Sequence, residues 1–379
     1  MRICFISHSA KKGGAERSLL ELLRALKKRK VEMYVILPTY GDLYDELRNL
    51  GITISIIPYC WWMSKNTTIW KRAVRLFFNI TMGFWIASKL KCWKPDIVYT
   101  NTITICVGAF AAKILGIPHV WHVHEFGYED HGLLFDLGEN LSLQLINKLS
   151  AICIANSNAT ARKYQQYIPP SKLKVIYYAV SLPNDNSSGK IPKDISASIK
   201  CAIVGQLQKG KRQEDAILAI RELVRIGLKP HLFIVGDGDP EYQRYLYELV
   251  YKNKLNDYIT FTGYVDNPIP FMGAVDVVLM CSKMEAFGRV TVEAMKLGKP
   301  VIGTRSGGTE ELIKDGFNGL LYTVGDYKEL AEKIKYLYEH RDIAEAIGKN
   351  AQKWALERFS EDLYAEEVLA TLQKVVANK

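Results

Sequence analysis

Residues 3–30 read ICFISHSAKKGGAERSLLELLRALKKRK and hold a strand pattern, a glycine turn and a helix pattern in succession. Ile3–Ser7 is an apolar run, and Ala15–Lys30 repeats leucine at helical spacing. This succession is typical of the opening unit of a Rossmann-like domain. Gly13 and Gly14 lie in the turn, where a missing Cβ lets backbone N–H groups approach a phosphate or a sugar. We therefore expect both glycines to contact a ligand of that kind.

The alternation of strand and helix patterns continues on both sides of one break in composition. Further strands are expected at Met33–Leu37, Thr53–Ile57, Ile97–Thr100, His119–His124 and Ile152–Asn156, and after the break at Cys201–Val204, His231–Val235, Ile259–Thr262, Val277–Met280 and Pro300–Gly303. The break itself, LPNDNSSGKIPKDISAS at 182–198, has no apolar period. Such alternation predicts an α/β fold with parallel sheets covered on both faces.

The positions of these elements predict two domains. We expect an N-terminal domain over 1–181, a linker over 182–198 and a C-terminal domain over 199–360. The stretch Glu361–Ala377 reads as a helix, and we expect the C-terminal helix, 361–379, to pack back onto the N-terminal domain. Two Rossmann-like doubly wound domains facing across a cleft would collect ligands at the carboxyl ends of their strands.

Composition excludes several classes of protein. The 379 residues are 48% apolar and 24% charged, which suits large buried cores and not a disordered chain. Seven cysteines without a C-x-x-C pair indicate neither a disulfide framework nor a zinc ribbon. No signal-peptide core opens the sequence, and the longest nearly uncharged apolar stretch, 76–87, falls short of the roughly 20 residues that span a bilayer. We expect a cytoplasmic protein.

The excess positive charge lies in the first half of the chain. Residues 1–180 hold 23 Lys and Arg against 12 Asp and Glu, a net +11, whereas residues 181–379 hold 27 against 28, a net −1. Within the first half, residues 59–94 carry seven of these bases, no acid and five of the seven tryptophans. Aromatic rings with flanking cations are typical of a helix at an anionic membrane surface. Equally open is a buried helix over Leu76–Ala87 that covers the sheet; nucleic acid is not expected, because no recognition module accompanies the tract.

A second group of residues that could carry chemistry follows the apolar strand Val277–Met280. It reads SKMEAFGRVTVEAM over 282–295, with Glu285 in the loop and Glu293 about one turn into the next helix. Carboxylates there suit sugar and ribose hydroxyls, and free N–H groups near Phe287 and Gly288 suit an oxyanion. The alternative is a solvated loop glutamate and a helix-surface glutamate.

Here the sequence resembles the family 4 retaining glycosyltransferases of the GT-B fold. Their E-x7-E signature matches Glu285 and Glu293, with Ala-Phe-Gly after the first and Ala-Met after the second. Further matches are Gly13-Gly14-Ala15-Glu16, His124-Glu125, Val204-Gly205, Lys211, Val235-Gly236-Asp237-Gly238, Phe261-Thr262-Gly263 and Gly307-Gly308, so the resemblance spans nearly the whole chain.

The resemblance implies a GT-B arrangement and a retaining transfer of a hexose-type sugar. The donor would be a UDP- or GDP-sugar and the acceptor a hydroxyl of a glycan or a lipid-linked glycan, as in cell-surface polysaccharide biosynthesis, with no metal ion or other cofactor. The implied catalytic residues are Glu285, His124 and Lys211, and the implied donor-binding residues are Gly13, Gly14, Gly205, Gln206, Lys211, Gly236, Phe287, Gly288 and Glu293.

Within that set, the resemblance gives Glu285 the donor-sugar hydroxyls and Glu293 the nucleotide ribose. Charge grows on the diphosphate as the glycosidic bond breaks, so fixed cations and N–H donors should dominate catalysis, and Lys211 is the candidate cation.

Two positions depart from the family pattern. Gln206 stands where the family usually has Arg, and a neutral amide supplies no charge to a phosphate. Lys211 and the helix start near Phe287 would then carry more of the load, with Lys209 and Arg212 close enough to compensate. Tyr178 also begins a Tyr-Ala pair where many relatives have Asn-Gly.

Four of the seven histidines lie in His119–His131. Period two places His122 and His124 on one face of a strand. The H-x-H pattern could hold zinc, but its spacing matches no standard site, so we expect no metal. The resemblance places His124 near the donor sugar, where it would bind or position rather than act as the sole base.

Two alternatives remain from the sequence. One is a GT-B sugar-nucleotide epimerase, which would turn over donor without an acceptor. The other is a non-catalytic nucleotide-sugar-binding protein of the same fold, an idea favoured by Gln206 alone.

Overall fold

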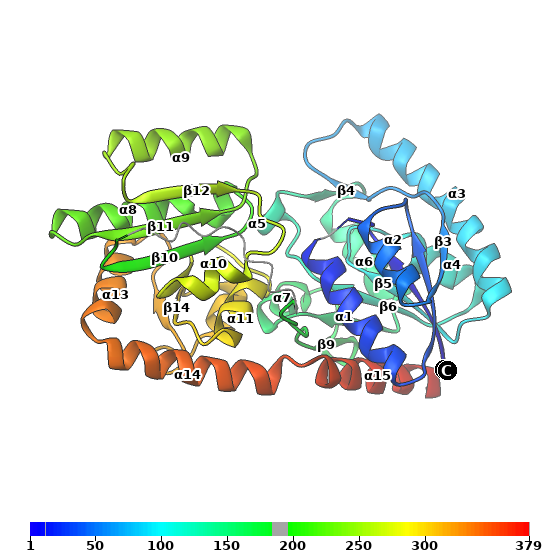
Figure 1. Cartoon of the computed structure of the whole chain (residues 1–379). Helices are drawn as coiled ribbons and strands as arrows, with labels where there is room; N and C mark the ends of the chain where they lie inside the picture. Colours follow the sequence, from blue (N-terminus) through cyan, green and yellow to red (C-terminus); the bar gives the residue numbers. More distant parts are fainter. Residues whose placement is uncertain (12, 184–195, 379) are drawn as a thin grey trace. The chain divides into compact units, whose positions relative to one another are not determined.

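The computed structural model describes residues 1–11, 13–183 and 196–378. It divides into two compact units (Figure 1): unit 1 comprises Met1–Val180 and Phe359–Lys379, and unit 2 comprises Ser181–Arg358. Most of the expected linker, residues 184–195, lies outside the described residues.

Unit 1 alternates strands with helices along the chain. Its strands are β1 (Arg2–Ser7), β2 (Glu32–Leu37), β3 (Thr53–Ile56), β4 (Met63–Ser64), β5 (Ile97–Asn101), β6 (His119–Val123), β7 (Leu134–Phe135), β8 (Ile152–Ala155) and β9 (Leu173–Val175); its helices are α1 (Gly14–Lys28), α2 (Asp42–Asn49), α3 (Ile69–Trp93), α4 (Val107–Leu115), α5 (Tyr128–His131), α6 (Glu139–Leu149), α7 (Asn158–Tyr164) and α15 (Glu361–Ala377). A short 3-10 turn, Pro170–Lys172, precedes β9.

Seven of these strands form one parallel sheet in the order β3-β2-β1-β5-β6-β8-β9, and β4 pairs antiparallel with β7. The chain winds outward from β1 to β3 and then crosses back to β5, which is the doubly wound order. Every residue of β5 and β6 is buried, as a sheet covered on both faces requires.

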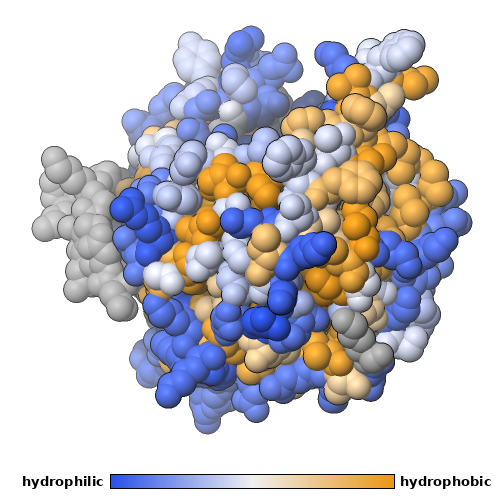
Figure 2. Space-filling view, turned by 90° about the vertical axis from the view of Figure 1, so that its right-hand side faces the viewer, coloured by the Kyte–Doolittle hydropathy of each residue, from blue (hydrophilic) through white to orange (hydrophobic). Residues whose placement is uncertain are grey.

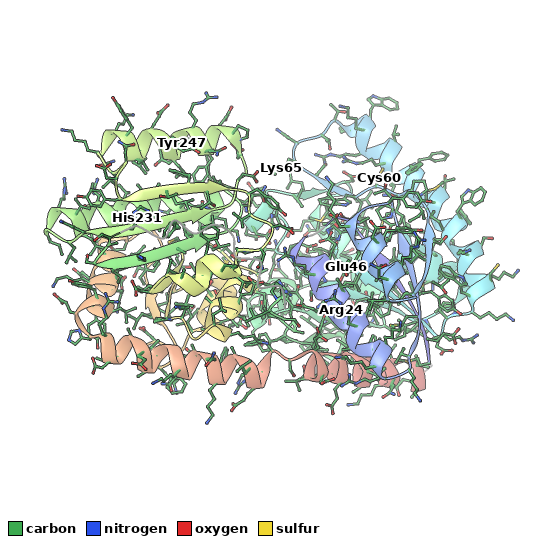
Figure 3. The ribbon with its side chains drawn as sticks, viewed as in Figure 1. Arg24, Glu46, Cys60, Lys65, His231 and Tyr247 are labelled. Atoms are coloured by element: carbon green, nitrogen blue, oxygen red, sulfur yellow. The ribbon has the colours of Figure 1, made fainter. Side chains whose placement is uncertain are left out.

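The leucine repeat explains why α1 forms and where it packs. Leu19, Leu22 and Leu26 are buried on one face. Basic residues in the last turn complement the helix dipole, and Arg24 reaches Glu46 of α2 at 3.0 Å (Figure 3).

Unit 2 repeats the plan. Its strands are β10 (Ile199–Val204), β11 (Pro230–Val235), β12 (Ile259–Gly263), β13 (Val277–Met280), β14 (Val301–Thr304) and β15 (Leu320–Tyr322); its helices are α8 (Gln213–Arg225), α9 (Pro240–Lys252), α10 (Ile269–Ala274), α11 (Arg289–Lys296), α12 (Gly307–Leu312), α13 (Tyr327–Glu339) and α14 (Arg341–Arg358), with a 3-10 turn at Lys209–Lys211. The six strands are parallel in the order β12-β11-β10-β13-β14-β15. A core of its own joins this sheet to its helices, with Ile203, Ile220, Leu246 and Ile334 among its buried members.

The expected α/β class with doubly wound parallel sheets is confirmed. Each expected strand is present, with its ends shifted by at most two residues. The edge strands β9 and β15 were not expected, because three residues are too short to show a strand period.

Candidate functional site

Each sheet has one pair of central strands at which the direction of winding changes. In unit 1 the pair is β1 and β5, and in unit 2 it is β10 and β13. Ligands of open parallel sheets bind beyond the carboxyl ends of such strands. The loops that leave these strands and their neighbours β6 and β11 hold the candidate site residues of each unit.

The loop after β13 in unit 2 brings Glu285 against the loop after β10. Lys211 Nζ lies 2.6 Å from Glu285 Oε2, and the Ser282 hydroxyl donates to the same oxygen at 2.9 Å. The two side chains of the ion pair are 27% and 17% exposed, so water only partly screens their attraction. The Lys283 N–H also donates to the Gly210 carbonyl at 2.8 Å, which fixes the two loops together. The two residues predicted as cation and carboxylate are thus direct partners.

The start of α11 follows the same loop. Gly288 precedes the helix with a φ of +94°, a conformation that favours glycine, and it supplies no side-chain cap to the first N–H groups. Phe287 is buried beside it. Glu293 lies in the second turn of α11 and is 6% exposed, so it is not the solvated surface glutamate of the alternative interpretation.

A glycine pair that the sequence analysis did not count as site residues supports this loop from behind. The Gly308 N–H donates to the Glu285 carbonyl at 2.6 Å. A Cβ on Gly307 would lie 2.5 Å from that carbonyl oxygen, and one on Gly308 would lie 2.6 Å from the Ala286 oxygen. Only glycines allow this approach of two backbones. The signal in the sequence that could have revealed it is the Gly-Gly pair shortly after β14.

Three strand-end loops of unit 2 are joined backbone to backbone. The Gly205 N–H donates to the Val235 carbonyl and the Gly236 N–H to the Gly263 carbonyl, both at 2.9 Å. A Cβ on Gly236 would lie 2.1 Å from the Gly205 oxygen. Gly205 and Gly236 are therefore brought together as neighbours, and each also has a positive φ.

The basic residues near Gly205 have different environments. Gln206 and Lys209 have exposed side chains. Arg212, expected to compensate for Gln206, instead makes a two-point ion pair with Asp215, at 2.8 and 2.7 Å. The hydrogen bond to Asp215 raises the pKa of the Arg212 guanidinium. Asp215 is buried, so its carboxylate depends on the positive charge of Arg212 beside it. Arg212 is thus engaged with Asp215, and its expected compensation for Gln206 stays a prediction, as does that of Lys209.

In unit 1, the turn after β1 contains a close histidine–glutamate contact that sequence reasoning missed. His8 Nε2 lies 3.1 Å from Glu16 Oε1. A Cβ on Gly13 would lie 2.4 Å from Glu16 Oε2, so this glycine lets the carboxylate fold back over the start of α1. Burial lowers the pKa of His8, an effect that Glu16 opposes. Trp61, 39% exposed, donates from Nε1 to the His8 carbonyl at 3.0 Å. The signal in the sequence that could have revealed this contact is the histidine directly after the first strand.

His124 sits in a buried chain of hydrogen bonds at the end of β6. Its Nε2 lies 2.7 Å from Asn101 Oδ1, and its Nδ1 contacts the Tyr178 hydroxyl. Asn101 Oδ1 only accepts, because its Nδ2 donates to the Ala15 carbonyl at 3.2 Å. Nε2 therefore carries the proton and Nδ1 accepts from Tyr178, whose oxygen accepts from Asn156 Nδ2 at 2.9 Å. The departure at Tyr178 noted in the sequence thus supplies a direct partner of His124.

Histidines 122 and 124 do share a face, with ring centroids 4.1 Å apart. The Tyr99 hydroxyl lies 2.5 Å from His122 Nδ1, and burial lowers the pKa of His122 to about 3. A neutral His122 is the consequence. Tyr364 of α15 approaches the same Nδ1 at 3.5 Å.

Glu125 follows His124 and is buried as well, 7% exposed. Its Oε1 accepts from the Ile103 N–H at 3.2 Å. Burial, and secondly the charge of Asp130, raise the pKa of this carboxyl to about 8. Glu125 is thus protonated over much of the neutral range.

Within the described ranges, no group of three or more His, Cys, Asp and Glu side chains is arranged to hold a metal ion. The same residues contain no helix long and apolar enough to cross a bilayer.

Comparison with known proteins gives a consistent result for both units. Residues 192–354 match the family model "Glycosyl transferases group 1", and residues 12–182 match "Glycosyltransferase Family 4". The chain is similar to N-acetyl-alpha-D-glucosaminyl L-malate synthase of Bacillus anthracis, 31% identical over 55% of this chain and 56% of that protein. It is also similar to the capsular polysaccharide biosynthesis glycosyltransferase CapM of Staphylococcus aureus, 25% identical over 60% of this chain and 63% of that protein. These matches span less than two thirds of each relative.

Among solved structures, the chain is similar to HepE of Anabaena in complex with UDP. The two are 26% identical with a TM-score of 0.81, over 99% of this chain and 100% of that one. HepE has also been solved with UDP-glucose, at 27% identity and a TM-score of 0.80.

Proposed function

The chain belongs to the group 1, family 4 glycosyltransferases of the GT-B fold, and from that premise we propose that it is a retaining, metal-independent hexosyltransferase. It moves a hexose from a nucleotide-sugar donor to a hydroxyl of a glycan or lipid-linked glycan in cell-surface polysaccharide biosynthesis. CapM, whose name states capsular polysaccharide biosynthesis, supports that setting. The HepE complexes with UDP and UDP-glucose favour a UDP-sugar over a GDP-sugar as donor.

The observation that carries the proposal is the Lys211–Glu285 pair beyond β10 and β13. In the reaction, the bond from the anomeric carbon to the diphosphate breaks, and a bond to the acceptor oxygen forms on the same face of the sugar. Nucleoside diphosphate and a proton are released. Lys211 stabilises the charge that grows on the diphosphate, and the N–H groups at the start of α11 add partial positive charge. Glu285 accepts hydrogen bonds from sugar hydroxyls, and Glu293 from the ribose.

His124 acts in this scheme by holding its loop rather than as a free base. Its two ring nitrogens contact Asn101 and Tyr178, so both are engaged within the protein. A role in positioning the backbone beside the sugar uses this geometry directly.

The cytoplasmic face of an anionic membrane is the proposed place of action. Residues 59–94, with seven bases and no acid, supply the attraction to anionic lipid.

A thermal-shift screen in EDTA tests the donor half of the proposal. The protein is titrated with UDP, GDP, ADP, CMP and their common sugar conjugates, and a ligand that binds the folded state raises Tm by mass action. We expect UDP and UDP-hexoses to raise Tm selectively. Lys211→Met should weaken UDP binding by about tenfold or more, whereas Lys252→Met, exposed at the end of α9, should change it by less than about threefold.

Turnover separates the alternatives. Release of UDP only when a hydroxyl acceptor is present supports transfer. Conversion of the donor sugar without acceptor would point to the epimerase, and donor binding without turnover across an acceptor panel to the non-catalytic protein. A rise in Tm that needs a divalent metal would contradict the metal-independent part.

A further inference from the structure

Helix α3 presents large apolar side chains on two opposite faces. One face packs into the core of unit 1 through Ile86, Ala87 and Leu90. The opposite face is exposed over most of its length: Ile69 and Trp70 are 82% exposed, Val74 65%, Phe77 73%, Ile80 43%, Phe84 60% and Trp85 66%. At about 100° per residue these seven side chains fall within an arc of roughly 160°. Figure 2, which faces the side where Figure 1 shows α3, has a continuous apolar band on that surface.

Positive charge surrounds this apolar face. Lys71 is exposed at its N-terminal end, and Lys91 and Lys94 are exposed at its C-terminal end. Lys65 lies just before the helix (Figure 3). No Asp or Glu occurs anywhere between residues 47 and 95 to neutralise these bases. Arg75 is not part of the charged surface, because its guanidinium reaches Asp136 and the Ser64 hydroxyl, the latter at 2.8 Å.

We propose that the outer face of α3 docks on an anionic lipid bilayer, with the helix lying in the plane of the membrane surface. This inference deepens the proposed function by naming the docking surface. It rests on the proposed function in one respect only, which is that a transferase acting on a lipid-linked glycan needs to be held at a membrane. Trp70, Phe77 and Phe84 enter the acyl boundary, and the lysines contact anionic headgroups. The apolar stretch from Ile69 to Trp85 is about 24 Å long at 1.5 Å per residue, enough to anchor in the plane.

The charge distribution favours a bilayer over a second copy of the chain. A two-fold contact between the outer faces of two α3 helices would set lysines against lysines at both ends, in either relative direction. An anionic surface instead pairs every one of them. A crossing of the membrane is not compatible with the structure, because the other face of α3 is part of the unit 1 core.

Co-sedimentation with vesicles tests the proposal. The full chain is mixed with vesicles of phosphatidylcholine alone or with phosphatidylglycerol added. We expect binding to the anionic vesicles that weakens as salt is raised, and a blue shift of tryptophan emission from Trp70 and Trp85 on binding. The triple variant Trp70→Ser, Phe77→Ser, Phe84→Ser should reduce partitioning at least tenfold, and the double variant Lys71→Glu, Lys91→Glu should do the same at low salt.

A matched control uses exposed apolar residues elsewhere. Tyr251→Ser with Leu356→Ser replaces side chains that are 75% and 54% exposed in unit 2, and partitioning should stay unchanged. Since all substituted side chains are exposed, Tm should change little, and an unchanged Tm shows that each variant is folded.

Protein that stays in the supernatant with anionic vesicles would overturn the proposal. A dimer, seen by light scattering and abolished by the α3 triple variant while vesicle binding is unaffected, would also overturn it and assign the face to a second copy. The UDP-induced rise in Tm is measured on the same samples. Loss of vesicle binding with that rise intact rejects the docking surface alone, whereas vesicle binding without any nucleotide response rejects the transferase function alone.

Discussion

At the scale of single residues, the Lys211–Glu285 pair joins two roles that sequence reasoning treated separately. The lysine is predicted to serve the diphosphate and the glutamate the sugar, yet their side chains form an ion pair at 2.6 Å. Under the proposed function, this ion pair would hold a cation and a carboxylate together beside the bond between sugar and diphosphate.

Substitution of Glu285 separates these roles. Glu285→Gln retains the shape and the Ser282 contact but releases Lys211 from its anionic partner. We expect kcat for sugar transfer to fall by about 10²-fold or more, while the Kd for UDP stays the same or improves. Glu332→Gln, on the exposed face of α13, is the control and should change neither. An unchanged transfer rate would remove Glu285 from the mechanism.

The glycines of unit 2 give a second prediction at this scale. Gly236→Ala places a Cβ 2.1 Å from the Gly205 oxygen at a φ of +134°, so the loops after β10 and β11 must separate. We expect a loss of about 2–4 kcal/mol in the free energy of unfolding, together with weaker UDP binding. Gly273→Ala in α10, where a Cβ meets nothing within 4 Å, should leave both unchanged or slightly improved. Urea titration and calorimetry measure the two effects, and equal stability of both variants would contradict the close approach.

Glu125 predicts a pH dependence of stability. Its folded pKa of about 8 lies above the ordinary 4.5, so between these values the folded state holds a proton that the unfolded state has lost. The stability that this proton provides is full below pH 4.5 and is lost as pH rises through 8. Glu125→Gln removes this pH dependence of stability, and its side-chain oxygen can still accept from the Ile103 N–H. We expect the variant to be more stable than the wild type by about 1–4 kcal/mol at pH 9 and nearly equal to it at pH 5.

The histidines act in the opposite direction and at lower pH. Burial lowers the pKa of His119 and His122 to about 3, so the unfolded state binds protons that the folded state refuses below about pH 6.5. The wild type and Glu125→Gln should therefore lose stability together on acidification, and the difference between the two should grow as pH rises from about 4.5 to 8. Melting curves over pH 5 to 9 check this; a constant difference would contradict a raised pKa for Glu125.

At the scale of elements, α3 has two faces with different environments. Sequence reasoning left open a lipid-facing helix or a buried one. The structure shows a buried face, where Ile86 and Leu90 enter the core, and an exposed apolar face that includes Trp70 and Phe77; contact of that face with lipid stays a prediction. Trp62, in contrast, is fully buried against Trp121, so the tract's tryptophans do not all belong to one surface.

Arg75 anchors α3 to the rest of unit 1. It makes a two-point contact with Asp136, whose side chain is only 2% exposed. Arg75→Met leaves that carboxylate buried without its cation, and we expect a loss of about 2–4 kcal/mol in the free energy of unfolding. Lys71→Met, four residues earlier and exposed, should cost less than about 0.5 kcal/mol. Urea denaturation measures both, and a double variant with Asp136→Asn that recovers stability would support the ion pair as the cause.

At the scale of the whole molecule, the two units have separate cores, but the chain visits unit 1 twice. The core of unit 2 lies within residues 199–347. Unit 1 includes α15 from the end of the chain, where Tyr364 and Leu372 are buried and the Tyr364 hydroxyl lies 3.4 Å from the Ser18 hydroxyl of α1.

Truncation after Arg358 should therefore affect the units differently. Removal of α15 exposes apolar surface of α1, so we expect the melting transition of unit 1 to fall or disappear while that of unit 2 stays in place. A fragment spanning 181–358 should fold and keep its response to UDP. Calorimetry with and without UDP distinguishes the transitions. Loss of both transitions on truncation would show that the units do not fold independently.

The sequence by itself determined the class of fold, the strands and the order in which they alternate with helices. Apolar runs such as Ile3–Ser7 and glycine turns such as Gly13-Gly14 are local signals, so they can be recognised from neighbouring residues alone. An apolar run of this length that is buried in a parallel sheet has few other conformations open to it. Through its resemblance to the family 4 glycosyltransferases, it also indicated Glu285, Lys211 and His124 as residues to test.

Only the tertiary structure decided which of these side chains are partners. Lys211 and Glu285 are 74 residues apart, and His124 and Tyr178 are 54 apart. Their meeting depends on strand order, which periodicity along the chain does not encode. The same reason explains why Gly307-Gly308 was not counted among the site residues: glycine is necessary at these positions only because the loop after β13 lies beside them.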